Sequence, residues 1–399
     1  MSALWKTKDI AIILTAAAIG FAGFTTVPRM TALILAVPVL WTLADSRYSA
    51  FAVILAYKLA ASRGLLPGAA VFLSEYHTPL QAAILYFLMS FGASLPFLIF
   101  WDDDKKLKAM GIVTAFLIAY LLPPISLIGI INPLLASGTI FRGQGFGGML
   151  AMLEIYAACS VSRKTTCAVL CIIAMFTVFP RDSWFDPSAP EGIMAVDTSF
   201  GRLGSGSFNF ERDFERVNMI FNDLKKRNLS GIEEKIIILP ETIAGRLNRT
   251  GIELWRGEIQ KSLPDKAVVF GAELPTGDGK KYDNAAVMLY EGKIAFTRQR
   301  IPVPYSMFKG PFAMTGANLH PWECGILPLP DGRKAAMIVC YEAFLTWPYI
   351  ASMTQKPDVI ISIANLWWRR ETSLPAAQKT AVSLWTLTFG IPAVFVQNI

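Results

Sequence analysis

The sequence is poor in metal-binding side chains and in charge. Only two of its 399 residues are histidines, His77 and His320, and the five cysteines form no Cys-x-x-Cys pair. Zinc and iron–sulfur sites need closely spaced Cys and His ligands, so we expect no metal and no cofactor. Charged residues make up 17% and apolar residues 53% of the chain, which lies outside the balance of a soluble protein and predicts a membrane part.

The net charge of +7 is concentrated in the apolar half of the chain. Residues 1–180 hold 12 Lys/Arg and 7 Asp/Glu, a balance of +5, which leaves 25 against 23, or +2, for the rest. The basic excess therefore belongs to the connections between apolar runs. This placement predicts membrane topology and no direct binding of nucleic acid.

The N-terminal half consists of apolar runs that approach the length needed to cross a bilayer, and we expect about seven transmembrane helices. Basic residues mark every second connection, from Lys6 and Lys8 to Arg163 and Lys164. Lys and Arg are retained in the cytoplasm, so the pattern predicts a multi-pass protein of the bacterial inner membrane with a cytoplasmic N-terminus and a periplasmic C-terminal domain. The expected spans are residues 10–24, 30–43, 48–61, 80–101, 110–131, 147–161 and 165–179.

Two charged residues inside these runs, Lys58 and Glu154, are costly in lipid and are expected to face the interior of the helix bundle.

From about residue 191 the pattern changes to short β-rich runs that alternate with helices, which predicts a layered α/β domain over residues 181–399, after a transmembrane domain over residues 1–180. In the first helix the apolar residues recur at steps of four and three, so that one face packs on a sheet. These residues are Phe210, Phe214, Val217, Phe221 and Leu224. The expected strands are residues 192–196, 235–239, 267–274, 284–290, 294–298, 335–339, 358–364 and 391–396.

Two of the expected strands end in reactive side chains. Residues 236–239 continue into Pro240-Glu241, and residues 335–339 continue into Cys340-Tyr341-Glu342. A structural cysteine or a helix-capping glutamate would explain either residue alone. Together they put a carboxylate and a thiol at strand ends, where reactive side chains collect in such sheets.

This order of strand–Pro-Glu, hairpin and strand–Cys-x-Glu resembles the nitrilase (carbon–nitrogen hydrolase) superfamily, which implies an αββα sandwich. Further similar positions are Asn284, the Asn-Leu-Trp-Trp segment at residues 365–368 and the helix that contains Gln378. Within the superfamily, the apolar half makes the chain similar to apolipoprotein N-acyltransferase.

The resemblance implies that Cys340 attacks an ester or amide carbonyl while Glu241 takes the thiol proton and Glu342 orients or activates within the site. A cation would stabilise the oxyanion. A thiolate beside a carboxylate needs such a positive charge, because like charges disfavour each other's ionised forms.

The position of the cation departs from the superfamily pattern. Here the segment reads Arg298-Gln299-Arg300-Ile301-Pro302-Val303-Pro304. Matching Ile301 to the family's leucine puts Arg298 at the lysine position, whereas matching Val303-Pro304 puts Gln299 there. We take Arg298 as the candidate, so the predicted catalytic residues are Glu241, Arg298, Cys340 and Glu342. Arginine is planar and never a proton donor at ordinary pH, so it does not replace lysine in full.

The apolar half, the α/β domain and this segment together resemble the TraB-type conjugal transfer proteins of agrobacterial and rhizobial plasmids. Two kinds of function stay open. The first is a thiol acyltransferase or amidase acting through Cys340 on a membrane lipid or an envelope acyl or amide substrate, including an apolipoprotein N-acyltransferase-like enzyme. The second is a non-catalytic membrane component of the conjugation machinery. A third option is a Cys–His protease that uses His320, but the sequence shows no Asn or Asp pattern that would orient this histidine.

Overall fold

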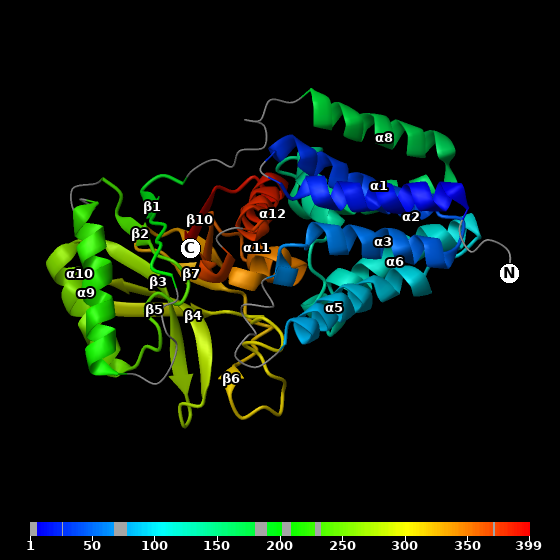
Figure 1. The fold of residues 1–399 in the computed structure, drawn as a ribbon. Coiled ribbons are helices and arrows are strands. Elements are labelled where there is room, and N and C mark those ends of the chain that lie inside the picture. Colours follow the sequence, from blue (N-terminus) through cyan, green and yellow to red (C-terminus); the bar gives the residue numbers. More distant parts are fainter. Residues whose placement is uncertain are drawn as a thin grey trace. The chain divides into compact units, whose positions relative to one another are not determined.

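The computed structural model describes residues 6–25, 27–67, 78–179, 190–201, 209–227, 233–369 and 372–399 (Figure 1). The chain forms two compact units, of which the first comprises Met1–Pro187, Phe344–Trp347 and Glu371–Ile391, and the second comprises Ser188–Ala343, Pro348–Arg370 and Pro392–Ile399. The expected boundary between residues 180 and 181 and the side chain of His77 lie outside the described residues.

The first unit is helical, and four of its described helices, α3, α5, α6 and α8, begin at polar side-chain caps. Ser46 accepts a hydrogen bond from the Ser49 N–H at the start of α3, and Asp104 caps α6 in the same way. Its elements are α1 (Thr7–Gly23), η1 (Pro28–Leu35), α2 (Ala36–Leu43), α3 (Arg47–Ala61), α5 (Pro79–Ile99), α6 (Lys105–Tyr120), η2 (Ile125–Leu127), η3 (Pro133–Thr139), α7 (Gly145–Val161), α8 (Arg163–Val178) and α12 (Leu374–Phe389).

Among the described residues, one helix, α5 with 21 residues, is long and apolar enough to cross a membrane. The expected span over residues 110–131 is not one helix, because α6 ends at Tyr120 and the following Pro123 and Pro124 cannot continue a helical hydrogen-bond ladder. The expected span over residues 30–43 is a 3-10 segment followed by the short helix α2.

The two charged residues of the apolar runs have different environments. Lys58 is fully buried, and its ammonium donates a hydrogen bond of 2.9 Å to the Ile130 carbonyl. Glu154 is exposed, so the prediction that it faces the bundle interior is wrong.

Helix α12 differs most from the expected domain organisation, because the sequence places it in the α/β domain. Its apolar residues pack instead against helical segments of the first unit, and the Gly138 backbone lies so close to Thr388 that a side chain at residue 138 would collide with it. Gln378, whose helix is one of the positions similar to the superfamily, is buried within α12.

The second unit contains two β-sheets. One has the strand order β1-β2-β3-β4-β5 with β6 paired to β4, and the other has the order β10-β9-β8-β7. The strands of the first sheet are β1 (Ile193–Ala195), β2 (Ile236–Ile238), β3 (Ala267–Thr276), β4 (Lys281–Tyr290), β5 (Lys293–Arg298) and β6 (Gly316–Ala317). Those of the second are β7 (Ile326–Pro328), β8 (Lys334–Val339), β9 (Val359–Asn365) and β10 (Ala393–Asn398).

Alternating side chains of these strands build a layered core. Val269 of the first sheet and Val339 and Ile361 of the second belong to one buried cluster, so the two sheets pack face to face. The opposite face of the first sheet is covered by α9 (Phe210–Lys226) and α10 (Arg249–Ser262). Helix α11 (Thr346–Met353) contains residues of both units.

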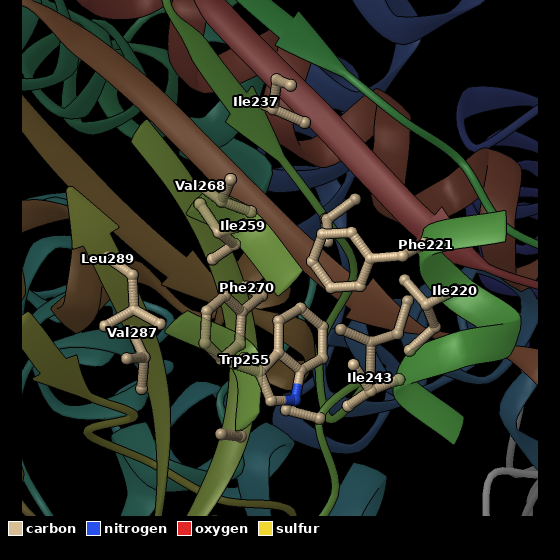
Figure 2. Packing of buried hydrophobic residues seen from close by; sticks show 14 of the residues in the cluster. Ile220, Phe221, Ile237, Ile243, Trp255, Ile259, Val268, Phe270, Val287 and Leu289 are labelled. Atoms are coloured by element: carbon tan, nitrogen blue, oxygen red, sulfur yellow. The ribbon is translucent and has the colours of Figure 1, made fainter. Parts of the chain in front are cut away.

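Figure 2 shows the helix-covered face, where Trp255 of α10 stacks on Phe270 of β3 with ring centroids 4.2 Å apart. Phe221 of α9 meets the same indole edge-on at 5.5 Å. The expected apolar face of α9 is correct for its second half but not for its first turns, because Phe210 and Phe214 are 58% and 42% exposed.

Candidate active site

The reactive side chains lie at the ends of strands in both sheets. Glu241 follows β2 and Cys340 follows β8, as the apolar runs that precede them predict. Cys340 and Thr242 both have a φ of 52°, a left-handed conformation that costs energy for residues other than glycine. Such backbone strain gathers where a side chain must be presented in one particular direction.

Glu241 is held by neighbours from three strands. One carboxylate oxygen accepts a hydrogen bond of 2.7 Å from the Asn284 amide, and the other accepts one of 2.9 Å from the Asn365 N–H. The Cys340 thiol is hydrogen-bonded to the same carboxylate. Burial raises the pKa of Glu241 to about 7, and these hydrogen bonds only partly oppose that effect.

The Cys340 thiol is poorly disposed to ionise. Its pKa is raised well above the ordinary value, first by burial and then by the adjacent Glu241 carboxylate. The N–H groups of Asn365 and Tyr341 donate toward the sulfur and lower its pKa, but they do not outweigh burial. The site therefore holds a neutral thiol beside a carboxyl group that titrates near neutral pH.

Gln299 occupies the place beside this pair, and it is buried with 1% of its surface exposed. Its side-chain oxygen accepts a hydrogen bond of 2.8 Å from the Asn284 amide that also binds Glu241. Its amide nitrogen donates one of 2.9 Å to the carbonyl of Val339, the residue before Cys340. The group next to Glu241 and Cys340 is thus a neutral amide.

Arg298 does not join the site, contrary to the prediction. Its guanidinium binds Asp283 at 2.8 Å and Glu323 at 2.7 Å and is about one-third exposed. Neighbouring residues at the end of an extended strand point to opposite faces, so a shift of one residue exchanges the inward and outward side chains. The alternative register, which matches Val303-Pro304 and places Gln299 at the family's lysine position, agrees with the geometry.

Glu342 lies close in sequence to Cys340, but its partner is Arg300. Both side chains are fully buried and their closest pair of atoms is 2.9 Å apart. The Glu342 carboxylate also accepts hydrogen bonds from the backbone N–H groups of Arg300, Ile301 and Val339. It therefore fastens the segment after Gln299 to the end of β8, which is a positioning role and not contact with the thiol.

The Arg300 guanidinium also donates hydrogen bonds to main-chain carbonyls. It donates to Met337 at 2.7 Å, to Pro348 at 2.8 Å and to Cys324 at 3.1 Å. Gly325 makes room for the guanidinium, since a Cβ there would lie 2.4 Å from it. Arg300 was not predicted as the partner of Glu342, because strand alternation places residues 298 and 300 on the same face and gives no reason to assign only one of them to the interior.

A polar network behind Glu241 was also missed. The Asn365 amide donates to the Thr242 hydroxyl at 2.6 Å, and the Asn398 amide donates to the Asn365 side-chain oxygen at 3.0 Å. His320 binds Asp283 at 2.8 Å and is engaged there with the Arg298 cluster. In the described part of the chain, no group of three or more His, Cys, Asp or Glu residues is arranged to hold a metal ion.

The raised pKa of Glu241 predicts a pH dependence of stability. Because the pKa is about 7 in the folded state and near its ordinary value of 4.5 in the unfolded state, the folded chain binds more protons between these values. The free energy of unfolding should therefore fall by about 3 kcal/mol as pH rises through this window. Glu241→Gln should flatten that slope in pulse proteolysis at graded urea; an equal slope in both proteins would show that Glu241 has an ordinary pKa.

Two stacked sheets with a carboxyl group and a thiol at neighbouring strand ends define a carbon–nitrogen hydrolase-like domain. The chain is 30% identical to the conjugal transfer protein TraB of Agrobacterium fabrum, over 97% of this chain and 92% of that protein. It is 28% identical to the probable conjugal transfer protein TraB of Sinorhizobium fredii, over 95% of each chain. The chain belongs to the family of TraB conjugal transfer proteins.

Solved structures with similarity to the chain include an amidase variant of the nitrilase superfamily from Nesterenkonia, with a TM-score of 0.38, 14% identity and coverage of 53% of this chain and 78% of that one. Another is a carbon–nitrogen hydrolase from Helicobacter pylori, with a TM-score of 0.36, 14% identity and coverage of 50% and 71%. No protein-family model matches the chain.

Proposed function

We propose that this protein is a multi-pass inner-membrane component of plasmid conjugal transfer whose carbon–nitrogen hydrolase-like domain binds a partner or envelope group and carries out no thiol chemistry. Its N-terminus lies in the cytoplasm and the domain lies in the periplasm. The transfer role follows from membership of the TraB family. Its partners are the conjugation machinery and the membrane, and no direct contact with nucleic acid is involved.

A single observation carries the non-catalytic assignment: the buried group beside Glu241 and Cys340 is the neutral amide of Gln299. Both arginines of the same segment are held elsewhere, Arg298 by Asp283 and Glu323 and Arg300 by Glu342. In the described part of the chain neither arginine of this segment reaches the pair, so a thiolate would form next to a carboxylate in a buried site, and both effects oppose its formation.

The surface of the helical unit supports the placement in a membrane. Large apolar side chains are exposed on six of its helices, a distribution that is costly in water and ordinary in lipid. They include Leu14, Phe21, Leu80, Leu88, Met110, Leu150, Met175 and Val178. With α5 as a helix of spanning length, this surface fits a unit that is surrounded by acyl chains.

A second candidate function is a thiol acyltransferase or amidase that acts on a membrane lipid or an envelope acyl or amide group. The hydrogen bond between Glu241 and Cys340 favours it, because a base of pKa about 7 in contact with a thiol can accept its proton during attack. The Tyr341 N–H, which already points at the sulfur, would then be a donor to the developing oxyanion.

Replacing the thiol separates the two functions. Cys340→Ala should leave the frequency of plasmid transfer unchanged, because the proposed role needs no nucleophile. Cys324→Ala, at an exposed cysteine of the same unit, is the matched control. Mating assays with both variants at equal membrane abundance provide the measurement. Loss of transfer in Cys340→Ala alone, with a Cys340 acyl adduct detected by peptide mass spectrometry, would establish the enzyme instead.

A further inference from the structure

The segment between β5 and β7 exposes several large apolar side chains along one connection of the chain. Within residues 303–322, here called the 303–322 loop, Phe312 is 96% exposed, Trp322 75%, Met314 73% and Tyr305 61%. Single exposed apolar residues are common on protein surfaces, but four in one connection form a concentrated apolar feature that marks a contact surface. The loop includes β6, which pairs with the start of β4 and is labelled among the yellow loops in Figure 1.

The loop presents these side chains on an ordered backbone. The Met307 N–H donates to the Val303 carbonyl at 3.1 Å, and the Ala317 N–H donates to the Met307 carbonyl at 2.8 Å. Asn318 anchors the returning limb by donating to the Asp283 carboxylate at 2.7 Å. Because the backbone groups are paired within the loop and with β4, the exposed side chains are not a consequence of an unfolded connection.

The charge of the loop distinguishes between possible occupants. Between Val303 and Trp322 the only formally charged side chain is Lys309, and the segment has no Asp or Glu. The carboxylates at its base, Asp283 and Glu323, are both bound by Arg298. Tyrosine, tryptophan and lysine side chains are typical of the boundary between lipid headgroups and acyl chains, and exposed apolar side chains such as Phe312 and Met314 are typical of segments that enter the acyl layer. An anionic bilayer surface attracts the Lys309 ammonium and does not repel a segment that is free of acidic residues.

We infer that the 303–322 loop docks on the lipid surface, with Phe312 and Met314 entering the apolar layer and Lys309 at the headgroups. The inference rests on the proposed placement of the chain in a membrane. The loop begins four residues after Gln299 and immediately after the segment that Glu342 fastens. Lipid contact at the loop and the geometry beside Cys340 therefore depend on one continuous stretch of chain.

Site-specific photocrosslinking in the full-length chain tests this contact. Phe312→benzoylphenylalanine, reconstituted in nanodiscs of phosphatidylethanolamine and phosphatidylglycerol, should yield lipid adducts in mass spectra after illumination. Ile294→benzoylphenylalanine is the matched control, since Ile294 is an exposed apolar residue of β5 in the same unit. It should yield none. Leu88→benzoylphenylalanine, on the exposed face of α5, reports on the membrane placement itself.

The outcomes separate the inference from the proposed function. Lipid adducts at residues 88 and 312 but not at 294 support the docking loop. Adducts at 88 alone overturn the docking loop and leave the membrane placement intact, whereas no adduct at 88 defeats that placement and the inference with it. Protein adducts at 312 in conjugating cells, without lipid adducts, would identify a protein-docking surface and overturn the inference.

A charge substitution gives a second readout. Phe312→Asp should reduce lipid crosslinking from a probe at residue 314 about 10- to 100-fold, which is the effect of losing the burial of one aromatic ring. Because Phe312 is almost wholly exposed, this change does not disturb the folded core. Unchanged crosslinking at residue 314 would show that the ring does not enter the bilayer.

Discussion

Gln299→Lys is expected to make the Cys340 thiol reactive. An ammonium group placed beside the thiol and Glu241 favours the ionised form of the sulfur, so it should lower the raised pKa of Cys340. A nearby opposite charge shifts a pKa by about 1–3 units, which corresponds to about 10- to 1,000-fold more thiolate at a fixed pH below both pKa values. The rate of iodoacetamide labelling of the Cys340 peptide, followed by mass spectrometry, should rise accordingly.

Two controls show whether the charge at residue 299 is responsible. Gln299→Met changes the side chain without adding charge and should not accelerate labelling. Arg298→Lys should also have no effect, because Arg298 is held by Asp283 and Glu323. If Arg298→Lys accelerates labelling and Gln299→Lys does not, the cation position would be residue 298, as the other sequence register predicts.

The reactive pair could be predicted because its signals are local. A buried strand followed at once by a carboxylate or a thiol is visible in a few residues, and both Glu241 and Cys340 lie where those patterns place them. Their hydrogen bond is a contact between residues 99 positions apart, which requires that the two sheets stack. The resemblance to the nitrilase superfamily supplied that arrangement, whereas the residue pattern alone did not.

The position of the cation could not be settled from the sequence because a one-residue shift reverses which side chains point inward. Arg298, Gln299 and Arg300 are all polar, so hydrophobic alternation gives no preference among them. The tertiary partners decide: Asp283 and Glu323 bind Arg298, and Glu342 binds Arg300. Gln299 is then the side chain that remains beside Asn284 and Glu241.

Domain organisation was harder to predict for a related reason. Helix α12 is apolar on much of its surface, and composition cannot distinguish packing on a sheet from packing on other helices. In the structure, Gly138 of η3 allows the backbone of α12 to approach closely at Thr388, and this contact between residues 250 positions apart leaves no periodic signal in the sequence. The helical unit therefore includes a segment that follows most of the α/β unit in the chain.

The largest effect on stability is expected from Arg300→Met. This substitution leaves the Glu342 carboxylate fully buried without its counter-ion, and breaking one side of a buried ion pair costs about 3–5 kcal/mol. The carbonyls of Met337, Pro348 and Cys324 also lose a donor. The midpoint of urea-induced unfolding of the α/β unit, followed by pulse proteolysis, should fall markedly.

The double variant Arg300→Met/Glu342→Gln tests the cause of this destabilisation. Since it removes the buried charge as well as its partner, it should be more stable than Arg300→Met alone, although the hydrogen bonds from the Arg300 guanidinium remain lost. Arg298→Met, two residues earlier, should cost less than Arg300→Met, because Arg298 is about one-third exposed and Asp283 keeps its hydrogen bonds to Asn318 and His320. Equal losses in Arg298→Met and Arg300→Met would contradict the assignment of Arg300 as the buried anchor. A double variant no more stable than Arg300→Met would show that the carbonyl contacts, and not the unpaired Glu342 charge, dominate the loss.

Whichever contact dominates, replacing Arg300 should make the segment that carries Gln299 more accessible to protease, because Glu342 fastens that segment to the end of β8.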